Sequence, residues 1–273
     1  MFSFCLRSGW LLRRAICPVL KPPPPPPPSP EEPYLLPPPP ADPAALAAAL
    51  FSFVELPQRW CRRLVLLGGQ TFSHRSRNVS AIDGNKLVCL DEPLRPPCLV
   101  YSFGSRDEWS FESDVIRRLG CEVHTFDPSL TGAAAPRHTH GAQFHALGLG
   151  GAARVTSRGW RLATLRDIRV QLGHLTHLIA YLKVDIEGGE WEWLEEVGQL
   201  QDVLQIGMEV HLPKPMTPAA LRRVYSAFRR LQQAGFRTVF SAVNPVFGRD
   251  SRVDGLKESV GRYYELVWVR VQF

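Results

Sequence analysis

The feature that most constrains the fold is residues 178–194, LIAYLKVDIEGGEWEWL, in which an apolar segment gives way to acidic groups. Its first half is a nearly continuous apolar run, which is typical of a strand covered on both faces in a parallel sheet. Asp185, Glu187 and Glu190 follow where this strand should end, and two glycines between them allow a sharp turn. Because ligands of open α/β sheets bind beside the carboxyl ends of the strands, the segment predicts a ligand site.

Strands and helices alternate on either side of this segment. The other predicted strands cover residues 98–103, 122–126, 143–147, 203–210, 237–243 and 263–271. One main helix follows Gly104 and ends at about Leu119, and the others cover residues 161–172 and 217–235. The last two strands are joined by a charged loop without a helix, so we expect an antiparallel hairpin there. The pattern predicts an α/β fold: a seven-stranded, mostly parallel sheet with a C-terminal antiparallel hairpin and helices on both faces.

Composition divides the chain into three predicted parts. Residues 1–43 hold more than half of the 25 prolines, which favours a disordered or extended spacer and cannot build a core. A ligand for a proline-recognition domain is the alternative. Residues 44–97 form an N-terminal cap with an alanine-rich helix opened by Pro43 and a peripheral turn and short strand at residues 82–90. Residues 98–273 form the alternating α/β domain.

The charge pattern argues against nucleic-acid binding, and the hydropathy pattern excludes a membrane-spanning helix. The net charge of +6 comes from dispersed basic residues, without the interleaved aromatics of single-strand binders, so nucleic-acid binding is not expected. No apolar run reaches the roughly 18 to 20 residues that a membrane-spanning helix needs. The first 20 residues are basic and lack a clean secretory signal, so a mitochondrial presequence stays open.

The cysteines bear on the compartment. The four after residue 50 can form two disulfides in three possible pairings, and Cys89 and Cys98, which bracket a proline-rich turn, are the favoured pair. Asn78 opens an N-glycosylation triplet. Buried free thiols are the alternative interpretation. Together these features favour a secreted protein or one of the secretory pathway, with mitochondrial and cytoplasmic locations as alternatives.

Polar residues follow three of the predicted strands: Gly104 and Ser105, then Asp127, then Asp185. A glycine lets the backbone approach a ligand, and an acid at the end of the next strand suits the two hydroxyls of a ribose. SFGSRDEW has one glycine, whereas NAD enzymes admit a pyrophosphate with G-x-G-x-x-G. The pattern predicts a nucleoside-containing cofactor without phosphates, and an NAD-dependent oxidoreductase is the less favoured alternative.

Several motifs resemble those of known methyltransferases. LKVDIEGGEW is similar to the strand-four motif of FkbM-type enzymes, and CLVYSFG, EWSFE, EVHTFDPS and HALGLGG resemble the methyltransferase-like protein 24 family. The resemblance runs from about Cys89 to the C-terminus and implies a Rossmann-like class I methyltransferase that binds S-adenosylmethionine. The chain departs from the FkbM-type pattern at Ser102, where that pattern has an acid, and at Glu108, where it has a second glycine.

The resemblance implies positions for the cofactor. Gly104 and Ser105 would lie under the methionine portion, and Asp127 would bind the ribose. The turn that begins at His145 would lie near the adenine, and Asp185 near the sulfonium. The residues implied as cofactor contacts are Phe103, Gly104, Ser105, Asp127, Pro128, His145, Ala146 and Asp185.

Methyl transfer from a sulfonium depends mainly on alignment of the acceptor, and a base is needed only if the acceptor holds a proton. By resemblance the acceptor is a hydroxyl of a small molecule or glycan that the sequence does not specify. The candidate catalytic residues are Asp185, Glu187, Glu209 and His211. The same four could hold a divalent cation, but no spaced motif supports a metal and none is predicted.

Each candidate has a structural alternative. Glu190 suits the first turn of a helix, where an acid is favourable. His211 could be an ordinary loop histidine. Trp191 and Trp193 could stack on a substrate or fill the core. For the whole protein, the alternative is a non-catalytic secreted binding module that retains the methyltransferase fold.

Overall fold

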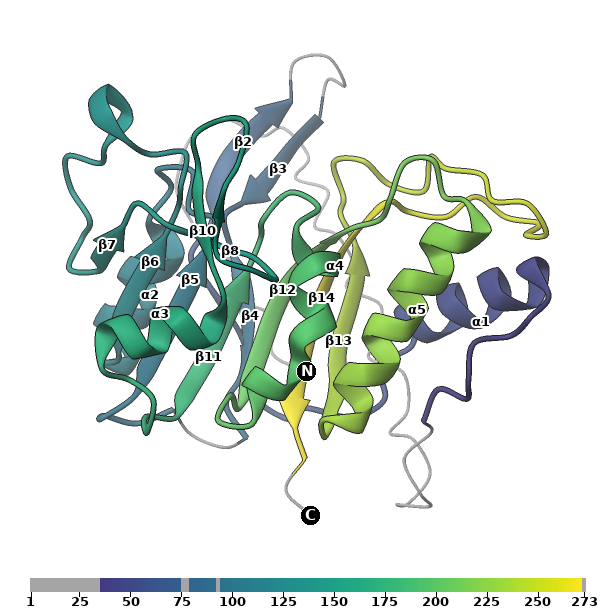
Figure 1. The fold of residues 1–273 in the computed structure, drawn as a ribbon, viewed down its shortest axis with the longest axis horizontal. Coiled ribbons are helices and arrows are strands. Elements are labelled where there is room, and N and C mark those ends of the chain that lie inside the picture. The colour runs from purple at the N-terminus through teal and green to yellow at the C-terminus, as the bar shows by residue number, and fades with distance from the viewer. Residues whose placement is uncertain (1–34, 75–78, 92–93, 272–273) are drawn as a thin grey trace, which may run out of the picture.

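A computed structural model describes residues 35–74, 79–91 and 94–271. Its centre is a seven-stranded sheet with strand order β13-β14-β12-β11-β5-β6-β7 (Figure 1). Within this sheet β14 runs antiparallel to both neighbours, and the other neighbouring pairs are parallel. The strands are β5 (Leu99–Phe103), β6 (Glu122–Phe126), β7 (Gln143–His145), β11 (Ile179–Val184), β12 (Gln205–His211), β13 (Phe236–Val243) and β14 (Tyr263–Arg270). The predicted sheet and its C-terminal hairpin are confirmed.

The strand order reverses between β5 and β11. From β5 the chain moves outward through β6 to β7, and then returns to the other side of β5 to form β11. Both β5 and β11 are buried at every position, as the apolar runs predict. Their carboxyl ends therefore meet at the topological switch point, where open α/β sheets bind ligands.

The two faces of the sheet are covered differently. One face packs against α1 (Pro43–Glu55), α3 (Leu165–Leu172), α4 (Glu190–Trp193) and α5 (Pro218–Gln233). In Figure 1, α3, α4 and α5 lie in front of the sheet. The other face packs against α2 (Ser110–Leu119) and a two-stranded sheet of β1 (Leu64–Leu67) and β4 (Lys86–Cys89). Helices lie on both faces as predicted, and the β1–β4 sheet completes the second face.

Two helices begin where the sequence predicts, and each has a side-chain cap. The Asp42 carboxylate accepts a hydrogen bond from the Ala45 amide (2.8 Å) at the start of α1, and the Thr217 hydroxyl accepts one from the Ala220 amide (3.2 Å) at the start of α5. The inner face of α1 enters the main core, where the Phe53 ring lies 5.8 Å from that of Phe228. The N-terminal helix therefore shares the core of the α/β domain.

The predicted helix over residues 161–172 begins later than expected. Arg161–Ala163 forms β10, which pairs with β8 (Gly148–Leu149) and β9 (Arg154–Val155). The Thr164 hydroxyl then accepts a hydrogen bond from the Asp167 amide (3.1 Å) and caps α3. Leu162 has helical spacing with the residues that follow, but the strand pairing of β10 and the Thr164 cap determine where α3 begins.

Residues 82–90 are not peripheral, which corrects that prediction. They span the turn between β3 (Val79–Asp83), which pairs with β2 (Gln70–His74), and β4. In β4 the Lys86 side chain is only 3% exposed, and β4 packs on the face of the sheet formed by β12 and β14. The short strand is therefore a covering layer, because it buries the face that the helices leave open.

The disulfides join Cys61 to Cys89 and Cys98 to Cys121, so the predicted Cys89–Cys98 pair is wrong. Cys98 and Cys121 precede the neighbouring strands β5 and β6, whose first residues are in register, and this brings their Cα atoms to 4.7 Å. Asn78 and residues 1–34 of the predicted spacer lie outside the described residues. The remainder of that segment packs against α5, where Leu36 is buried and the Tyr225 hydroxyl donates to the Pro37 carbonyl (3.1 Å). In the described part of the chain, no helix has the length and apolar character needed to span a membrane.

Candidate functional site

The turn after β5 packs directly against the end of β11. Gly104 has a φ of 82°, and a Cβ built on it would lie 1.8 Å from the carbonyl oxygen of Asp185, so only glycine fits. The Gly104 amide donates to the Phe126 carbonyl (2.9 Å), and the Lys183 ammonium donates to the Gly104 carbonyl (2.8 Å). Contacts from both neighbouring strands therefore hold this turn in place.

A carboxyl group from α2 lies against the same turn. Glu112 is fully buried, and one of its oxygens accepts a hydrogen bond from the Ser102 hydroxyl (2.5 Å). Ser102 occupies the position where the FkbM-type pattern has an acid, so a helix supplies a carboxyl that the strand lacks. Within the described residues, the second oxygen of Glu112 and the buried hydroxyl of Ser105 have no hydrogen-bond partner. Buried polar atoms without partners at a predicted cofactor turn are consistent with a ligand there.

Asp127 lies at the end of β6 and is 5% exposed. Its carboxylate accepts hydrogen bonds from the amides of Arg106 (2.8 Å) and Ser129 (2.9 Å) and from the Ser129 hydroxyl (2.5 Å). Arg106 and Asp107 both have positive φ, at 52° and 62°, which closes the loop over Asp127. A carboxylate accepts about four hydrogen bonds, so Asp127 can accept about one more from a ribose hydroxyl. Rotation of the Ser129 side chain would free a second position.

The predicted adenine region adjoins Asp127. The Asp127 amide donates to the His145 carbonyl (3.1 Å), and Pro128 packs against Gly148. The His145 ring stacks on Phe126 at 4.7 Å, and burial, followed by the neighbouring histidines, lowers the pKa of His145 to about 4.

Two predicted cofactor contacts have contrasting positions. Ala146 is exposed. The ring of Phe103 is fully buried and stacks on Phe126 at 4.5 Å, so Phe103 can meet a cofactor only through its backbone.

The loop after β11 is organised by Glu190. This side chain is fully buried in the first turn of α4, and it accepts hydrogen bonds from the amides of Ile186 (3.2 Å) and Gly188 (3.4 Å). The same oxygen lies 3.1 Å from Nδ1 of His211. Glu190 therefore does more than place a charge at a helix terminus: it shapes the loop and orients the histidine of the next strand.

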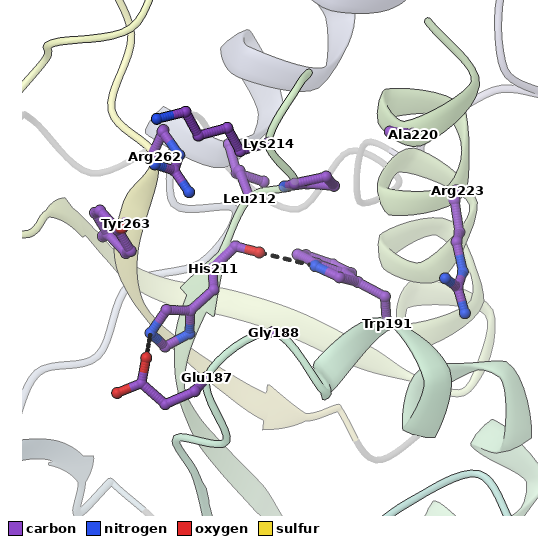
Figure 2. A pocket seen from close by; sticks show the side chains of 11 residues that line it. Glu187, Gly188, Trp191, His211, Leu212, Lys214, Ala220, Arg223, Arg262 and Tyr263 are labelled. Atoms are coloured by element: carbon purple, nitrogen blue, oxygen red, sulfur yellow. Dashed lines mark hydrogen bonds and ion pairs between the residues drawn. The ribbon is translucent and has the colours of Figure 1, made fainter. Parts of the chain in front are cut away.

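His211 lies between two carboxylates at the end of β12. Its Nε2 is 3.5 Å from the Glu187 carboxylate, which is largely exposed (Figure 2). Burial opposes a charge on His211, but the hydrogen bond and charge of Glu190, with smaller contributions from other acids, raise its pKa to about 9. At neutral pH His211 is a cation that donates hydrogen bonds and is not a free base.

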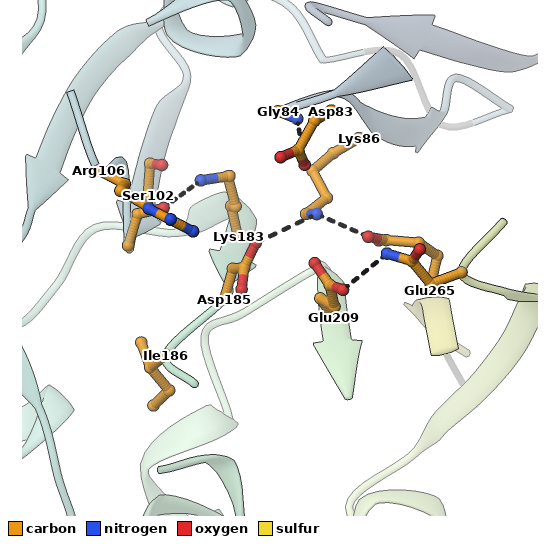
Figure 3. A network of polar contacts seen from close by, with 12 residues as sticks. Asp83, Gly84, Lys86, Ser102, Arg106, Lys183, Asp185, Ile186, Glu209 and Glu265 are labelled. Atoms are coloured by element: carbon orange, nitrogen blue, oxygen red, sulfur yellow. Dashed lines mark hydrogen bonds and ion pairs between the residues drawn. The ribbon is translucent and has the colours of Figure 1, made fainter. Parts of the chain in front are cut away.

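A buried lysine from β4 connects the remaining acids (Figure 3). The Lys86 ammonium lies 2.9 Å from the Glu265 carboxylate and 3.6 Å from that of Asp185. Burial opposes the charge of Lys86, but these two acids raise its pKa above its usual range. Burial likewise opposes ionisation of Asp185, but Lys86 and Lys183 lower the pKa of Asp185 below its usual value. Asp185 is therefore ionised at neutral pH.

Glu209 behaves oppositely to its neighbour Asp185. Burial, and then the negative charge of Asp185, raise the pKa of Glu209 to about 8. The Asn244 amide donates to Glu209 (3.0 Å), and the carboxyl of Glu209 is hydrogen-bonded to Asp185. Glu209 therefore carries a proton at neutral pH, and the two carboxyls share one negative charge.

Four residues that the sequence prediction missed lie on β4, β11 and β14 and directly after β13. Lys183 and Glu265 are charged residues inside apolar strand runs, and this irregularity could have marked them. Lys86 and Asn244 follow unremarkable turn and strand patterns, so no local signal marks them. Lys86 reaches the site only because β4 packs against β12, and Asn244, which follows β13, reaches it through its hydrogen bond to Glu209.

A pocket of about 450 Å³ opens beside His211 and Glu187 (Figure 2). The Trp191 ring forms one wall, and its Nε1 donates to the His211 carbonyl (2.8 Å). Trp193 is buried in the core instead. The pocket is lined by Glu187, Gly188, Trp191, His211, Leu212, Pro213, Lys214, Ala220, Arg223, Arg262 and Tyr263.

Asp185, Glu209 and His211 each offer a possible metal ligand, and the three atoms lie within 4.8 Å of one another. However, His211 is held as a cation between two carboxylates, and the Lys86 ammonium already lies beside Asp185. The negative charge of these carboxylates is therefore already neutralised by Lys86 and by bound protons, which disfavours a metal cation at this site.

Comparison with known proteins identifies the family. A family model described as a methyltransferase domain matches residues 68–252. The chain belongs to this methyltransferase family. It is 32% identical over 180 residues to human and rat proteins named "Probable methyltransferase-like protein 24", which covers 56% and 55% of this chain. Those alignments cover 47% of each relative, so this methyltransferase-family chain spans about half the length of the curated relatives it matches.

Among solved structures, the fold is similar to a Methanococcus jannaschii fibrillarin pre-rRNA processing protein, with 10% identity and a TM-score of 0.40. The match covers 65% of this chain and 68% of that one. This likeness is too distant to inform the reaction of this family member.

Replacing Glu209 with glutamine is expected to flatten the pH dependence of stability. A carboxyl whose pKa rises from 4.5 to about 8 on folding stabilises the protein while protonated, and this contribution is lost as the pH rises through 8. The free energy of unfolding can be measured in urea at pH 6 and at pH 9. The difference between Glu209→Gln and the native chain should shift in favour of the variant by roughly 1 to 3 kcal/mol from the lower to the higher pH. The raised pKa of His211 also lowers stability as the pH rises, but it does so in both the native chain and the variant.

The matched control is Glu258→Gln, because Glu258 is an exposed glutamate. Its stability profile should run parallel to that of the native chain. Parallel profiles for Glu209→Gln as well would show that Glu209 does not hold its proton in the folded state.

Proposed function

We propose that this chain is an S-adenosylmethionine-dependent methyltransferase that acts on a hydroxyl of a small molecule or glycan. The observation that carries the proposal is the assembly of Gly104, Asp127 and Asp185 at the ends of β5, β6 and β11, around the switch point of the sheet. Membership of a methyltransferase family supports methyl transfer as the reaction class.

The residues at the switch point fit this cofactor. The close approach of Gly104 to Asp185 provides a turn without side-chain bulk. The buried Ser105 hydroxyl has no hydrogen-bond partner among the described residues and can therefore bond a ligand. Asp127 would bind the ribose, with His145 and Pro128 beside it. When bound, the cofactor supplies an electrophilic methyl group on a sulfonium. Asp185, which is ionised, suits the positive charge of that group.

Protonation divides the roles of the candidate catalytic residues. At neutral pH Glu209 and His211 carry protons, so neither can accept one from a hydroxyl. Asp185 is ionised, and its side chain is 23% exposed at the end of β11. We therefore assign Asp185 to accept the hydrogen bond and then the proton of the acceptor hydroxyl. His211 and Glu187 would orient the acceptor from the adjoining pocket.

The pocket favours an acceptor that carries a negative charge. Lys214 is exposed on its wall, and Arg262 lies over the Tyr263 ring at 5.1 Å. The buried Nε of Arg262 has no hydrogen-bond partner among the described residues, whereas Arg223 is paired with Glu195 at 2.8 Å. Lys214 and Arg262 are thus suited to bind a carboxylate, sulfate or phosphate, as an acidic glycan would present.

One observation favours a second candidate, a non-catalytic secreted binding module. The loop from Arg106 folds over Asp127, whose carboxylate already accepts three hydrogen bonds. The two disulfides favour the oxidising secretory pathway over a mitochondrial or cytoplasmic location for either candidate.

Calorimetric titration separates these candidates. The native chain is expected to bind S-adenosylmethionine and not NAD, and Asp127→Ala should weaken binding at least tenfold, because the loss of one charge-assisted hydrogen bond costs about 1.5 to 3 kcal/mol. Asp254→Ala, on an exposed loop, is the control and should bind normally. Absence of binding of either compound by the native chain would leave only the binding module.

The role of Asp185 is tested with Asp185→Asn, which preserves shape and removes the charge. Transfer of labelled methyl to p-nitrophenyl glucuronide should fall about 100-fold or more in kcat, the range expected for a general base. Glu209→Gln, which keeps a hydrogen-bond donor, should lose only a few-fold at pH 7. Equal activity of Asp185→Asn and the native chain would exclude this assignment.

The charge preference of the pocket is tested with two probes that differ in one carboxylate. Lys214→Ala and Arg262→Ala are each expected to raise KM for p-nitrophenyl glucuronide about tenfold, with little change for p-nitrophenyl glucoside, since a charge-assisted hydrogen bond contributes about 1.5 to 3 kcal/mol. Arg223→Ala, whose guanidinium is paired with Glu195, is the matched control. A similar loss for both sugars would argue against recognition of the carboxylate.

A further inference from the structure

Three side chains of the metal-binding types meet away from the methyl-transfer site. Glu122 and His124 lie two residues apart on β6 and so share one face of the sheet, and His174 follows the end of α3. One ligand atom from each lies within 4.8 Å of the other two. The closest pair is Nε2 of His124 and a carboxylate oxygen of Glu122, at 2.9 Å.

Both imidazole rings are held through their other nitrogen. Nδ1 of His124 lies 2.9 Å from Nε2 of His145, and Nδ1 of His174 lies 2.8 Å from the Tyr101 hydroxyl. These contacts leave Nε2 of each ring for a metal ion. Histidines that bind metals are commonly oriented in this way by a second group, which fixes the ring and its tautomer.

The surroundings combine a rigid side with an open side. His124 is only 2% exposed and packs against Tyr101 at 5.7 Å, whereas the Glu122 side chain is about half exposed (53%). The Gln143 amide also reaches Glu122, at 2.9 Å. The open side leaves room for water in a fourth coordination position.

We propose that Glu122, His124 and His174 bind Zn²⁺. Two imidazoles and one carboxylate, with water as the fourth ligand, form a donor set that zinc accepts in tetrahedral geometry. Mg²⁺ and Ca²⁺ are excluded by their preference for oxygen ligands. The ion would join β6, which Asp127 follows, to the loop that leads into β11, which Asp185 follows. It would therefore brace two of the strands that carry the methyl-transfer site.

The test is titration of ZnCl₂ into the chelator-treated full chain, in a Cys5→Ser/Cys17→Ser background so that the N-terminal thiols do not compete. We expect one Zn²⁺ per chain and a higher Tm with zinc, and no such response to MgCl₂. Glu122→Gln and His174→Ala should each weaken zinc binding at least tenfold. Circular dichroism of each variant checks that it is folded.

Two controls locate the ion. His138→Ala removes an exposed loop histidine, and Glu209→Gln alters the acidic cluster at the end of β12; both should bind zinc as the native chain does. Absence of zinc binding by the native chain would overturn the proposal. Loss of binding in Glu209→Gln with retention in Glu122→Gln would also overturn it, by placing the ion at the other cluster. The titration uses no methyl donor, so its outcome is independent of the proposed reaction.

Discussion

The site depends on one close contact, the packing of the Gly104 turn against the carbonyl of Asp185. Because a Cβ would lie 1.8 Å from that oxygen, any other residue would force the ends of β5 and β11 apart. The buried Lys183 ammonium holds the Gly104 carbonyl from the neighbouring strand. This contact fixes where Asp127 and Asp185 lie relative to each other, and hence where a cofactor could be held.

The chemistry of the site also depends on the balance of charge within a buried cluster of side chains. Four ionisable side chains, Lys86, Asp185, Glu209 and Glu265, share the ends of β4, β11, β12 and β14. The N-terminal part of the chain supplies the lysine, so it contributes to the site as well as covering the sheet. The proton on Glu209 leaves Asp185 as the ionised member, and this asymmetry gives two similar carboxyls different chemistry.

Some errors of prediction have a common physical origin. The Cys98–Cys121 disulfide depends on the register of two parallel strands, and the late start of α3 depends on the pairing of β10 with β8 and β9. Glu112 reaches Ser102 because α2 packs beneath the first turn. Each of these contacts joins residues through pairing or packing, which hydrophobic periodicity and capping signals do not record.

The sequence by itself determined the order of strands and helices, the C-terminal hairpin, the starts of α1 and α5, and the strand ends that carry Gly104, Asp127 and Asp185. These follow from local chemistry: apolar periodicity, the conformational freedom of glycine and the geometry of helix termini. Only the tertiary structure decided that Lys86 lies beside Asp185, that Glu209 is protonated, and that His174 meets β6. Burial and charge at these positions arise from segments that are distant in the chain, so the pKa of each group is a property of the folded packing.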